Sequence, residues 1–185
     1  MKTVTTWLTR TLAVAALLLG GVTLAAPAAQ AAPAAQLSTC ANSPVPAGYV
    51  ISAITVTNRC NGFRLYTLNT PYDNVMACAN SPIPDGWAIT TVTMTNMCDG
   101  YKAFSLHTPA NNLMVCANSP IPSGYVITAI TMTNMCDGFK GFWLSRPYNN
   151  VMACANSPIP PGWVIAAMTN TNMCDGYQGW FLQSV

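Results

Sequence analysis

The chain has 185 residues, of which 51% are hydrophobic and 6% are charged, and its formal net charge is +2. Two of its seven basic residues, Lys2 and Arg10, lie in an N-terminal leader, so the remaining chain carries five basic and five acidic residues. A neutral, charge-poor surface disfavours nucleic acid, which recruits proteins through phosphate charge. It equally disfavours acidic membranes and polyanions, so neutral polar ligands fit this composition best.

The leader spans residues 1–31. Its basic start, the apolar run 11–25 and the small residues of Ala29-Gln30-Ala31 are typical of a cleaved secretory signal peptide of bacterial type. The apolar run is shorter than the about 20 residues that a transmembrane helix needs. We therefore expect a secreted, extracellular protein with no membrane span after cleavage of the signal.

The exported part is built from a tandem repeat. The sequence Cys-Ala-Asn-Ser-Pro-x-Pro begins at Cys40, Cys78, Cys116 and Cys154, always 38 residues apart. A fixed period of this length indicates a repeat architecture. The predicted repeats are 32–77 (with an N-terminal strand), 78–115, 116–153 and a truncated fourth at 154–185.

The third copy shows the elements expected in each repeat. Its first segment, 116–124, contains two prolines and a glycine and predicts an extended loop. Residues 125–133 are rich in β-branched side chains and predict a strand. A tight turn at Asp137-Gly138 leads into the returning strand 139–144. A short third strand, 151–154, then enters the next loop, so every predicted element is β or loop.

Two features of this pattern leave alternatives open. Ile127 and Ile130 have opposite parity in one strand, which indicates burial on both faces or a β-bulge. The strand-like segment 36–39 precedes the first copy, whereas the last copy stops before such a strand. Either the chain holds four complete units, or its first strand closes a ring with the fourth copy. The expected fold is an all-β array of four 38-residue repeats of about three strands each, compactly stacked or closed into a ring.

All eight cysteines follow the leader, which predicts a disulfide framework in an oxidising compartment. Each second cysteine pairs either within its own repeat or with the next repeat, and the latter scheme leaves Cys40 and Cys174 unpaired unless the chain closes. We prefer pairing within repeats. The predicted bridges are Cys40–Cys60, Cys78–Cys98, Cys116–Cys136 and Cys154–Cys174.

Residues for catalysis are scarce. The one histidine, His107, is replaced by Asn, Ser or Gln in the other copies, and the chain has no glutamate. With the cysteines in disulfides, no Ser-His-Asp or Cys-His set can be assembled, so we expect a protein that is not an enzyme. Ca²⁺ is the candidate cofactor, with Asp137, Asn134 and the pair 149–150 as oxygen ligands. The alternative is that these residues are simply turn formers.

Each copy carries three aromatic positions. Rings directly after the Asx-Gly turn (Phe63, Tyr101, Phe139, Tyr177) and three residues later (Tyr66, Phe104, Phe142, Trp180) are expected in the core. The position after the Pro-rich loop is always Tyr or Trp, residues that suit a half-wet surface.

Such rings stack on the C–H faces of sugars while Asn and Asp bond the hydroxyls, so we predict one weak saccharide site per copy. Four linked sites would act as a multivalent lectin-like or cell-envelope-binding module. The candidate ligand-binding residues are Asn42, Tyr49, Asn58, Asn80, Trp87, Asn96, Asp99, Asn118, Tyr125, Asn134, Asp137, Asn156, Trp163, Asn172 and Asp175.

Two alternative functions come from other classes. Low charge and β-rich strands favour a structural or adhesive envelope protein that self-associates. Separately, Cys-Ala-Asn-Ser-Pro-Ile-Pro resembles, over seven residues, the reactive loop of Bowman–Birk-type protease inhibitors. That resemblance implies a scissile bond between Asn80 and Ser81. This sequence departs from the family pattern, because Pro82 follows the serine directly and the next cysteine comes late, at Cys98.

Overall fold

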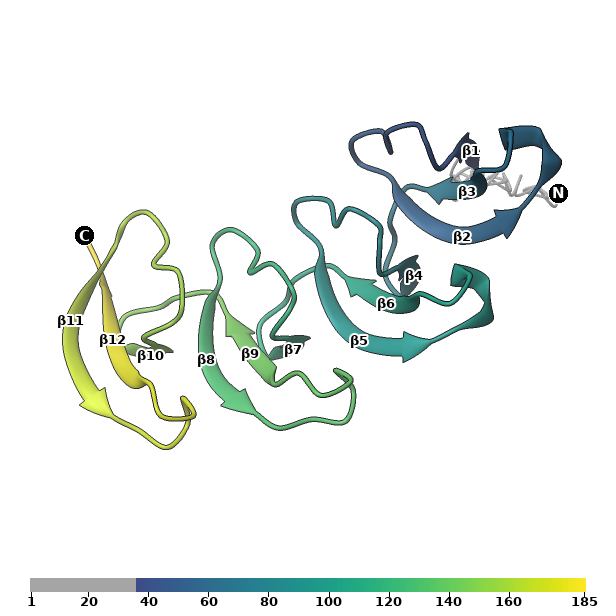
Figure 1. The fold of residues 1–185 in the computed structure, drawn as a ribbon. Helices are drawn as coiled ribbons and strands as arrows, with labels where there is room; N and C mark the ends of the chain where they lie inside the picture. The colour runs from purple at the N-terminus through teal and green to yellow at the C-terminus, as the bar shows by residue number, and fades with distance from the viewer. Residues whose placement is uncertain (1–35) are drawn as a thin grey trace, which may run out of the picture. The chain divides into compact units, whose positions relative to one another are not determined.

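The computed structural model describes residues 36–185, so the predicted signal peptide (residues 1–31) lies outside the described residues. The described chain is all-β and forms four antiparallel three-stranded sheets, one per repeat (Figure 1). The first two sheets comprise β1 (Leu37–Cys40), β2 (Val50–Val56) and β3 (Arg64–Asn69), then β4 (Val75–Cys78), β5 (Ala88–Met94) and β6 (Lys102–His107). The other two comprise β7 (Leu113–Cys116), β8 (Val126–Thr131) and β9 (Gly141–Ser145), then β10 (Val151–Cys154), β11 (Trp163–Asn170) and β12 (Gln178–Ser184).

In every sheet the returning strand is central, with the short strand on one side and the long strand on the other. The first strand, β1, pairs with β3 of its own sheet, and β10 pairs with β12 in the same way. Each structural unit therefore starts with the short strand that precedes its first cysteine. The N-terminal strand completes the first unit instead of closing a ring with the fourth.

Each long strand contains a β-bulge near its start, as the mixed parity predicted. In β8 the register shifts between Ile127 and Ala129. Because the bulge changes which side chains share a face, Ile127 and Ile130 are both buried. The same shift occurs in β2, β5 and β11.

The hairpin turns explain the Asx-Gly pairs. After β5, the short 3₁₀ helix η2 (Asn96–Cys98) ends at Asp99, which has φ 47°, followed by Gly100 with φ 87°. Two successive left-handed residues favour Asn or Asp and then Gly. The first unit has the same turn after η1 (Asn58–Cys60).

The four disulfides join the cysteines of each unit to one another: Cys40–Cys60, Cys78–Cys98, Cys116–Cys136 and Cys154–Cys174. This is the scheme of pairing within repeats. The bridges also belong to the contacts between units. Cys116 and Cys136 of the third unit pack with Ile89 and Val92 of the second, so the apolar clusters span consecutive units and the units are stacked.

A buried serine of the Pro-rich loop holds consecutive units together. Ser119 Oγ accepts a hydrogen bond of 2.8 Å from the backbone N–H of Ile89 in the preceding unit, and it donates to the carbonyl of Pro120. Ser81 and Ser157 make the same inter-unit bond. Ser43 of the first unit is exposed. Packing between units therefore explains the serine in the second, third and fourth copies of the motif.

Replacing Ser119 by alanine is expected to destabilise the protein, because the Ile89 N–H would stay buried without an acceptor. A loss of about 1–3 kcal/mol in the free energy of unfolding is typical for such a group. Urea denaturation under non-reducing conditions measures it. Ser43→Ala is the matched control and should change stability by less than about 0.5 kcal/mol. Equal effects of the two substitutions would contradict the assigned role.

Candidate functional site

The structure separates the residues that the sequence grouped into one site per repeat. The Tyr/Trp ring after the Pro-rich loop packs on the apolar clusters: Tyr125 is buried, and Tyr49, Trp87 and Trp163 are half-buried. The turn asparagines lie elsewhere, on the surface. They are Asn58, Asn96, Asn134 and Asn172.

The rings directly after the Asx-Gly turns are exposed, so the expectation that they form the core is wrong. Between 47% and 50% of the surface of each remains accessible. The turn itself is the reason, because it projects beyond the sheet and carries the ring with it. The rings three residues later are half-buried and pack beside the core clusters. We call the exposed set the turn rings. They are Phe63, Tyr101, Phe139 and Tyr177.

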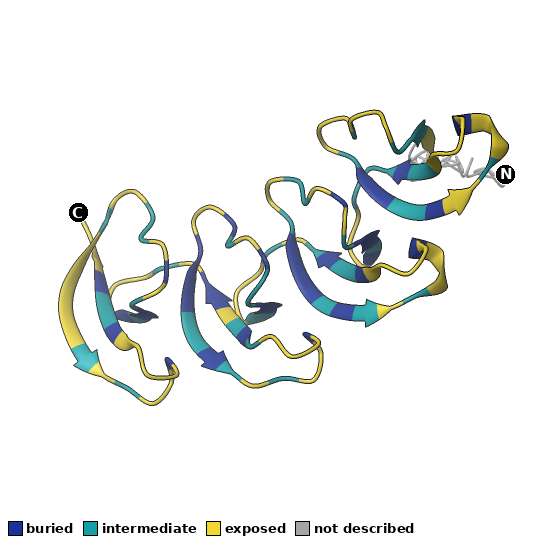
Figure 2. Cartoon of the chain, viewed as in Figure 1, coloured by how far each residue is buried: buried dark blue, intermediate teal, exposed yellow. Residues whose placement is uncertain are grey.

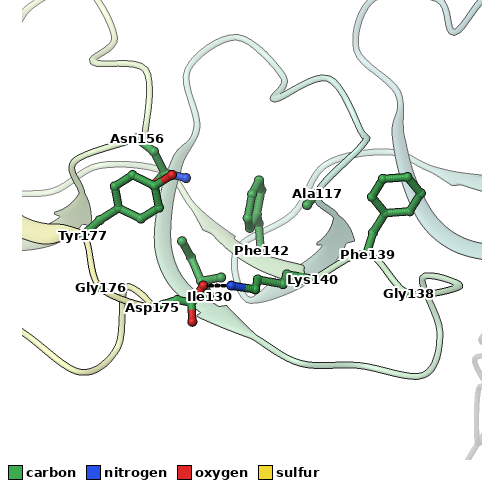
Figure 3. Close-up of a pocket in the computed structure, with 10 residues that line it drawn as sticks. All are labelled: Ala117, Ile130, Gly138, Phe139, Lys140, Phe142, Asn156, Asp175, Gly176 and Tyr177. Atoms are coloured by element: carbon green, nitrogen blue, oxygen red, sulfur yellow. Dashed lines mark hydrogen bonds and ion pairs between the residues drawn. The ribbon is translucent and has the colours of Figure 1, made fainter.

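A pocket of about 590 Å³ lies between the third and fourth units (Figure 3). The third unit contributes Ile130, Lys140 and Phe142, and the fourth contributes Asn156 and the turn ring Tyr177. Asp175 of the fourth unit also lines it. Two of the predicted site positions of the fourth unit, the loop asparagine and the turn aspartate, therefore line the same pocket, but at a unit boundary and beside different rings. We call this arrangement the inter-unit pocket.

An ion pair crosses each unit boundary at this place. Lys140 of the third unit pairs with Asp175 of the fourth, and Lys102 pairs with Asp137 one unit earlier. Arg64 Nε lies 2.5 Å from Asp99 Oδ2 at the first boundary. These side chains are between 31% and 46% exposed. Exposed pairs contribute about 0–1 kcal/mol each, so their main consequence is that the pocket carries no net charge.

The first boundary has an equivalent pocket of about 370 Å³. It is lined by Ile54, Tyr66 and the turn ring Tyr101, together with Arg64 and Asp99. The hydroxyl of Tyr66 accepts a hydrogen bond of 3.3 Å from the Nδ2 of the loop asparagine Asn80.

The second boundary carries the same residue types, with Phe104 where the first has Tyr66 and with the turn ring Phe139. Phenylalanine has no hydroxyl that could accept from the Nδ2 of the loop asparagine, here Asn118, and among the described residues the other end of this amide lacks a partner as well. The Oδ1 atom of Asn118 is buried and has no hydrogen-bond partner among residues 36–185. A buried carbonyl without a donor is costly, and a ligand hydroxyl could supply the missing donor.

The Pro-rich loops frame a second kind of hollow. Trp87, Pro120, Tyr125 and Arg146 line a space of about 500 Å³ between the loops of the second and third units. The Tyr125 hydroxyl donates to the carbonyl of Pro109 and accepts from Arg146 Nε, which raises the pKa of the guanidinium. The Tyr125 hydroxyl and the Arg146 guanidinium are thus bonded to each other, and Asp85 and Ser123 are further polar residues that line this hollow.

Two of the residues proposed as calcium ligands have side-chain oxygens that are bonded to protein groups. Asp137 is paired with Lys102, and Asn149 Oδ1 accepts from the backbone N–H and the hydroxyl of Ser184. Within residues 36–185 no cluster of three or more His, Cys, Asp or Glu side chains is present. The turn-forming explanation accounts for these Asx residues.

His107 lies near Asp73, with 3.9 Å between Nδ1 and Oδ1. Asp73 accepts hydrogen bonds from the backbone N–H and the hydroxyl of Thr108, and these bonds lower the pKa of the carboxyl. The segment that joins one unit to the next is called a connector. Asn111 and Asn149 occupy the same position in later connectors and accept hydrogen bonds from the corresponding backbone N–H groups. Asp73 is thus a connector residue.

The lowered pKa of Asp73 predicts a pH dependence of stability. The folded state holds this proton less tightly than the unfolded state, so the stabilisation is present above about pH 4 and is lost as the pH falls through the folded pKa. Asp73→Asn keeps the acceptor oxygen, and therefore should leave stability near neutral pH unchanged while reducing its fall in acid. Urea denaturation at several pH values checks this, and an unchanged acid dependence would refute it.

In the loop that resembles a protease inhibitor, the serine at the implied scissile bond is buried in three of the four units. Ser81, Ser119 and Ser157 are each at least 92% buried, since their relative exposures are 8%, 7% and 7%. The residues on either side of Ser81, Asn80 and Pro82, are exposed, and in the first unit Ser43 is exposed too. Only the serine of the later copies, and not the whole loop, is therefore covered by the preceding unit.

Comparison of the chain with protein-family models, with curated proteins and with solved structures finds no match. Residues 36–185 contain no helix long and apolar enough to cross a membrane. Their four disulfides are of the kind found in oxidising, extracellular surroundings.

The grouping of candidate residues by repeat did not identify the boundaries between units as binding sites. A signal for them was present: Arg64, Lys102 and Lys140 each precede an aspartate by 35 residues, three short of the repeat period. Opposite charges at that constant offset indicate that each cation meets the turn of the next copy.

Proposed function

We propose that this protein is a secreted, non-enzymatic, multivalent carbohydrate-binding protein that takes neutral saccharides in its inter-unit pockets. One observation carries the proposal. At the first and third boundaries, an exposed turn ring of one unit and a half-buried ring of the preceding unit line the same pocket, as Tyr177 and Phe142 do (Figure 3).

The chemistry of the pocket suits a sugar. Binding sites are commonly lined by apolar and aromatic side chains with a few polar groups that fix orientation. Here Phe142 and Tyr177 provide ring faces for the C–H groups of a pyranose, and the Asn156 amide and the Tyr177 hydroxyl provide hydrogen-bonding groups at the rim.

The charges favour a neutral ligand over an ionic one. Lys140 and Asp175 neutralise each other, so a phosphate or a carboxylate would have to compete with an existing ion pair. The same holds for Lys102 with Asp137. A nucleic acid needs a basic field that these paired cations do not supply.

Repetition explains how weak sites become useful. A shallow pocket of this kind binds one sugar weakly, but linked sites on one chain raise the apparent affinity for a polymer by about 10²- to 10⁴-fold. Four stacked units present three boundaries. A polysaccharide or a glycan-coated surface is the ligand class that gains most from this arrangement.

A glycan array and a pull-down with insoluble polysaccharides test the proposal. The purified protein should bind a subset of neutral glycans, with polymers retained more strongly than their monomers. The double variant Tyr72→Ala/Tyr148→Ala removes exposed rings from the connectors and should bind like the parent protein. Absence of binding to every neutral glycan and polysaccharide would refute the proposed function.

The alternative of a self-assembling envelope protein is favoured by one separate observation. The fourth unit exposes the strand face that the following unit covers in the other three.

A further inference from the structure

The long strand of the fourth unit, β11, is exposed where its equivalents are buried (Figure 2). In β8 the exposed fraction is 1% for Ile127 and 9% for Ile130. At the same two positions of β11, it is 38% for Ile165 and 64% for Met168. The difference arises because β2, β5 and β8 each lie against the short strand of the following unit.

The exposed strand β11 has the apolar composition of the long strands that are covered in the other units. Val164, Ile165 and Met168 are apolar, as are Val126, Ile127 and Ile130 at the same positions of the covered strand β8. Exposed apolar side chains grouped on one strand are typical of an interaction site. The exposed strand β11 therefore has the composition of a docking face.

This face also lacks the inter-unit hydrogen bonds made elsewhere. At the second boundary, the Ile89 N–H donates to Ser119 Oγ and the Val92 N–H donates to the carbonyl of Met135. No following unit within residues 36–185 supplies such acceptors to the N–H groups of Ile165 and Met168.

The first unit presents the complementary elements. Ser43, the equivalent of the serines that bond to the preceding unit, is exposed. Leu37 is 43% exposed, whereas Val75 at the same position of the second unit is 2% exposed. The turn ring Phe63 is exposed as well.

The side chains that form ion pairs inside the chain have changed together at its two ends. Gln178 stands where the earlier units have Arg64, Lys102 or Lys140, and Asn61 stands where the later units have aspartate. A charge kept at only one end would meet an uncharged partner. Two amides match each other instead, because each has both a donor and an acceptor.

We infer that the exposed face of the fourth unit docks the first unit of a second copy of this chain, so that chains join head to tail. The contact repeats the boundary already made three times within the chain. Because it joins two different surfaces, it is heterologous and generates an open filament or a ring of chains. Where the proposed function holds, the junction also forms one more inter-unit pocket, between Trp180 and Phe63.

Sedimentation velocity of the purified protein without saccharide tests the inference, at protein concentrations from about 1 μM to about 1 mM, where contacts of micromolar to millimolar Kd become populated. The parent protein should show a mean mass that grows with concentration. Ile165→Asp places a charge on the docking face and should remain monomeric throughout. Tyr148→Asp, at an exposed connector residue, should associate like the parent.

Three further variants separate docking from folding. Ser43→Ala should weaken association while the urea denaturation midpoint stays the same. Asn61→Lys/Gln178→Lys places like charges across the junction and should weaken association, whereas Asn61→Asp/Gln178→Lys should preserve it. A parent protein that is monomeric at every concentration would overturn the inference, as would undiminished association of Ile165→Asp. Since no saccharide is present, failure of the glycan screen does not affect this result.

Discussion

Replacing the turn rings Tyr101, Phe139 and Tyr177 by alanine together is expected to lower the affinity for a bound polysaccharide by about 10²- to 10⁴-fold, the range that linked weak sites contribute. Tyr101 lines the pocket at the first boundary, and Phe139 and Tyr177 line the pocket at the third. Their substitution removes exposed walls of these pockets and leaves the buried clusters intact. The fold should therefore survive, because each ring is about half exposed. Binding isotherms on the polysaccharide selected by the screen measure the change.

Two exposed tyrosines that lie outside the pockets provide the control for this experiment. Tyr72 and Tyr148 are 59% and 62% exposed, but they lie in connectors and do not line the inter-unit pockets. Their replacement by alanine should leave binding unchanged. If the connector variant lost binding while the turn-ring variant retained it, the site would lie elsewhere on the surface.

Removing the disulfide of the third unit, by Cys116→Ser/Cys136→Ser, is expected to have the largest effect on stability. The bridge spans 20 residues, and a loop of this length corresponds to about 3 kcal/mol of unfolding free energy in the chain-entropy model. The loss should exceed this value, because both cysteines also pack against Ile89 and Val92 of the preceding unit. Urea denaturation under non-reducing conditions measures it.

The first unit supplies the comparison. The Cys40–Cys60 bridge also spans 20 residues, but Cys40 is only half-buried and no described unit precedes it. Cys40→Ser/Cys60→Ser should therefore cost less than the third-unit variant. Equal losses would show that the contact of the disulfide with the preceding unit contributes nothing to stability.

Much of a single unit could be predicted from sequence because its signals are local. The Pro-rich loop, the β-branched strand 125–133 and the Asp137-Gly138 turn are each fixed by residues close in the chain. The bulge was also indicated, since Ile127 and Ile130 cannot share one face of a regular strand. The cysteine spacing favoured pairing within repeats.

The candidate site was harder to predict because it forms between units. The turn ring Tyr177 has the sequence context of a core residue, yet it is exposed because its turn projects beyond the sheet. Tyr125 has the context of a surface ring, yet it is buried because its hydroxyl finds the carbonyl of Pro109 and Arg146. Which face of a unit is covered depends on the neighbouring unit. The sequence pattern within a single unit does not show which face that is.

Methyl NMR of the isoleucine side chains during a saccharide titration tests the central claim most directly. Ile54 and Ile130 line the inter-unit pockets, whereas Ile83 and Ile121 line the hollows between the Pro-rich loops. The account predicts that saccharide shifts the signals of Ile54 and Ile130 and leaves those of Ile83 and Ile121 in place. Shifts confined to Ile83 and Ile121 would contradict it.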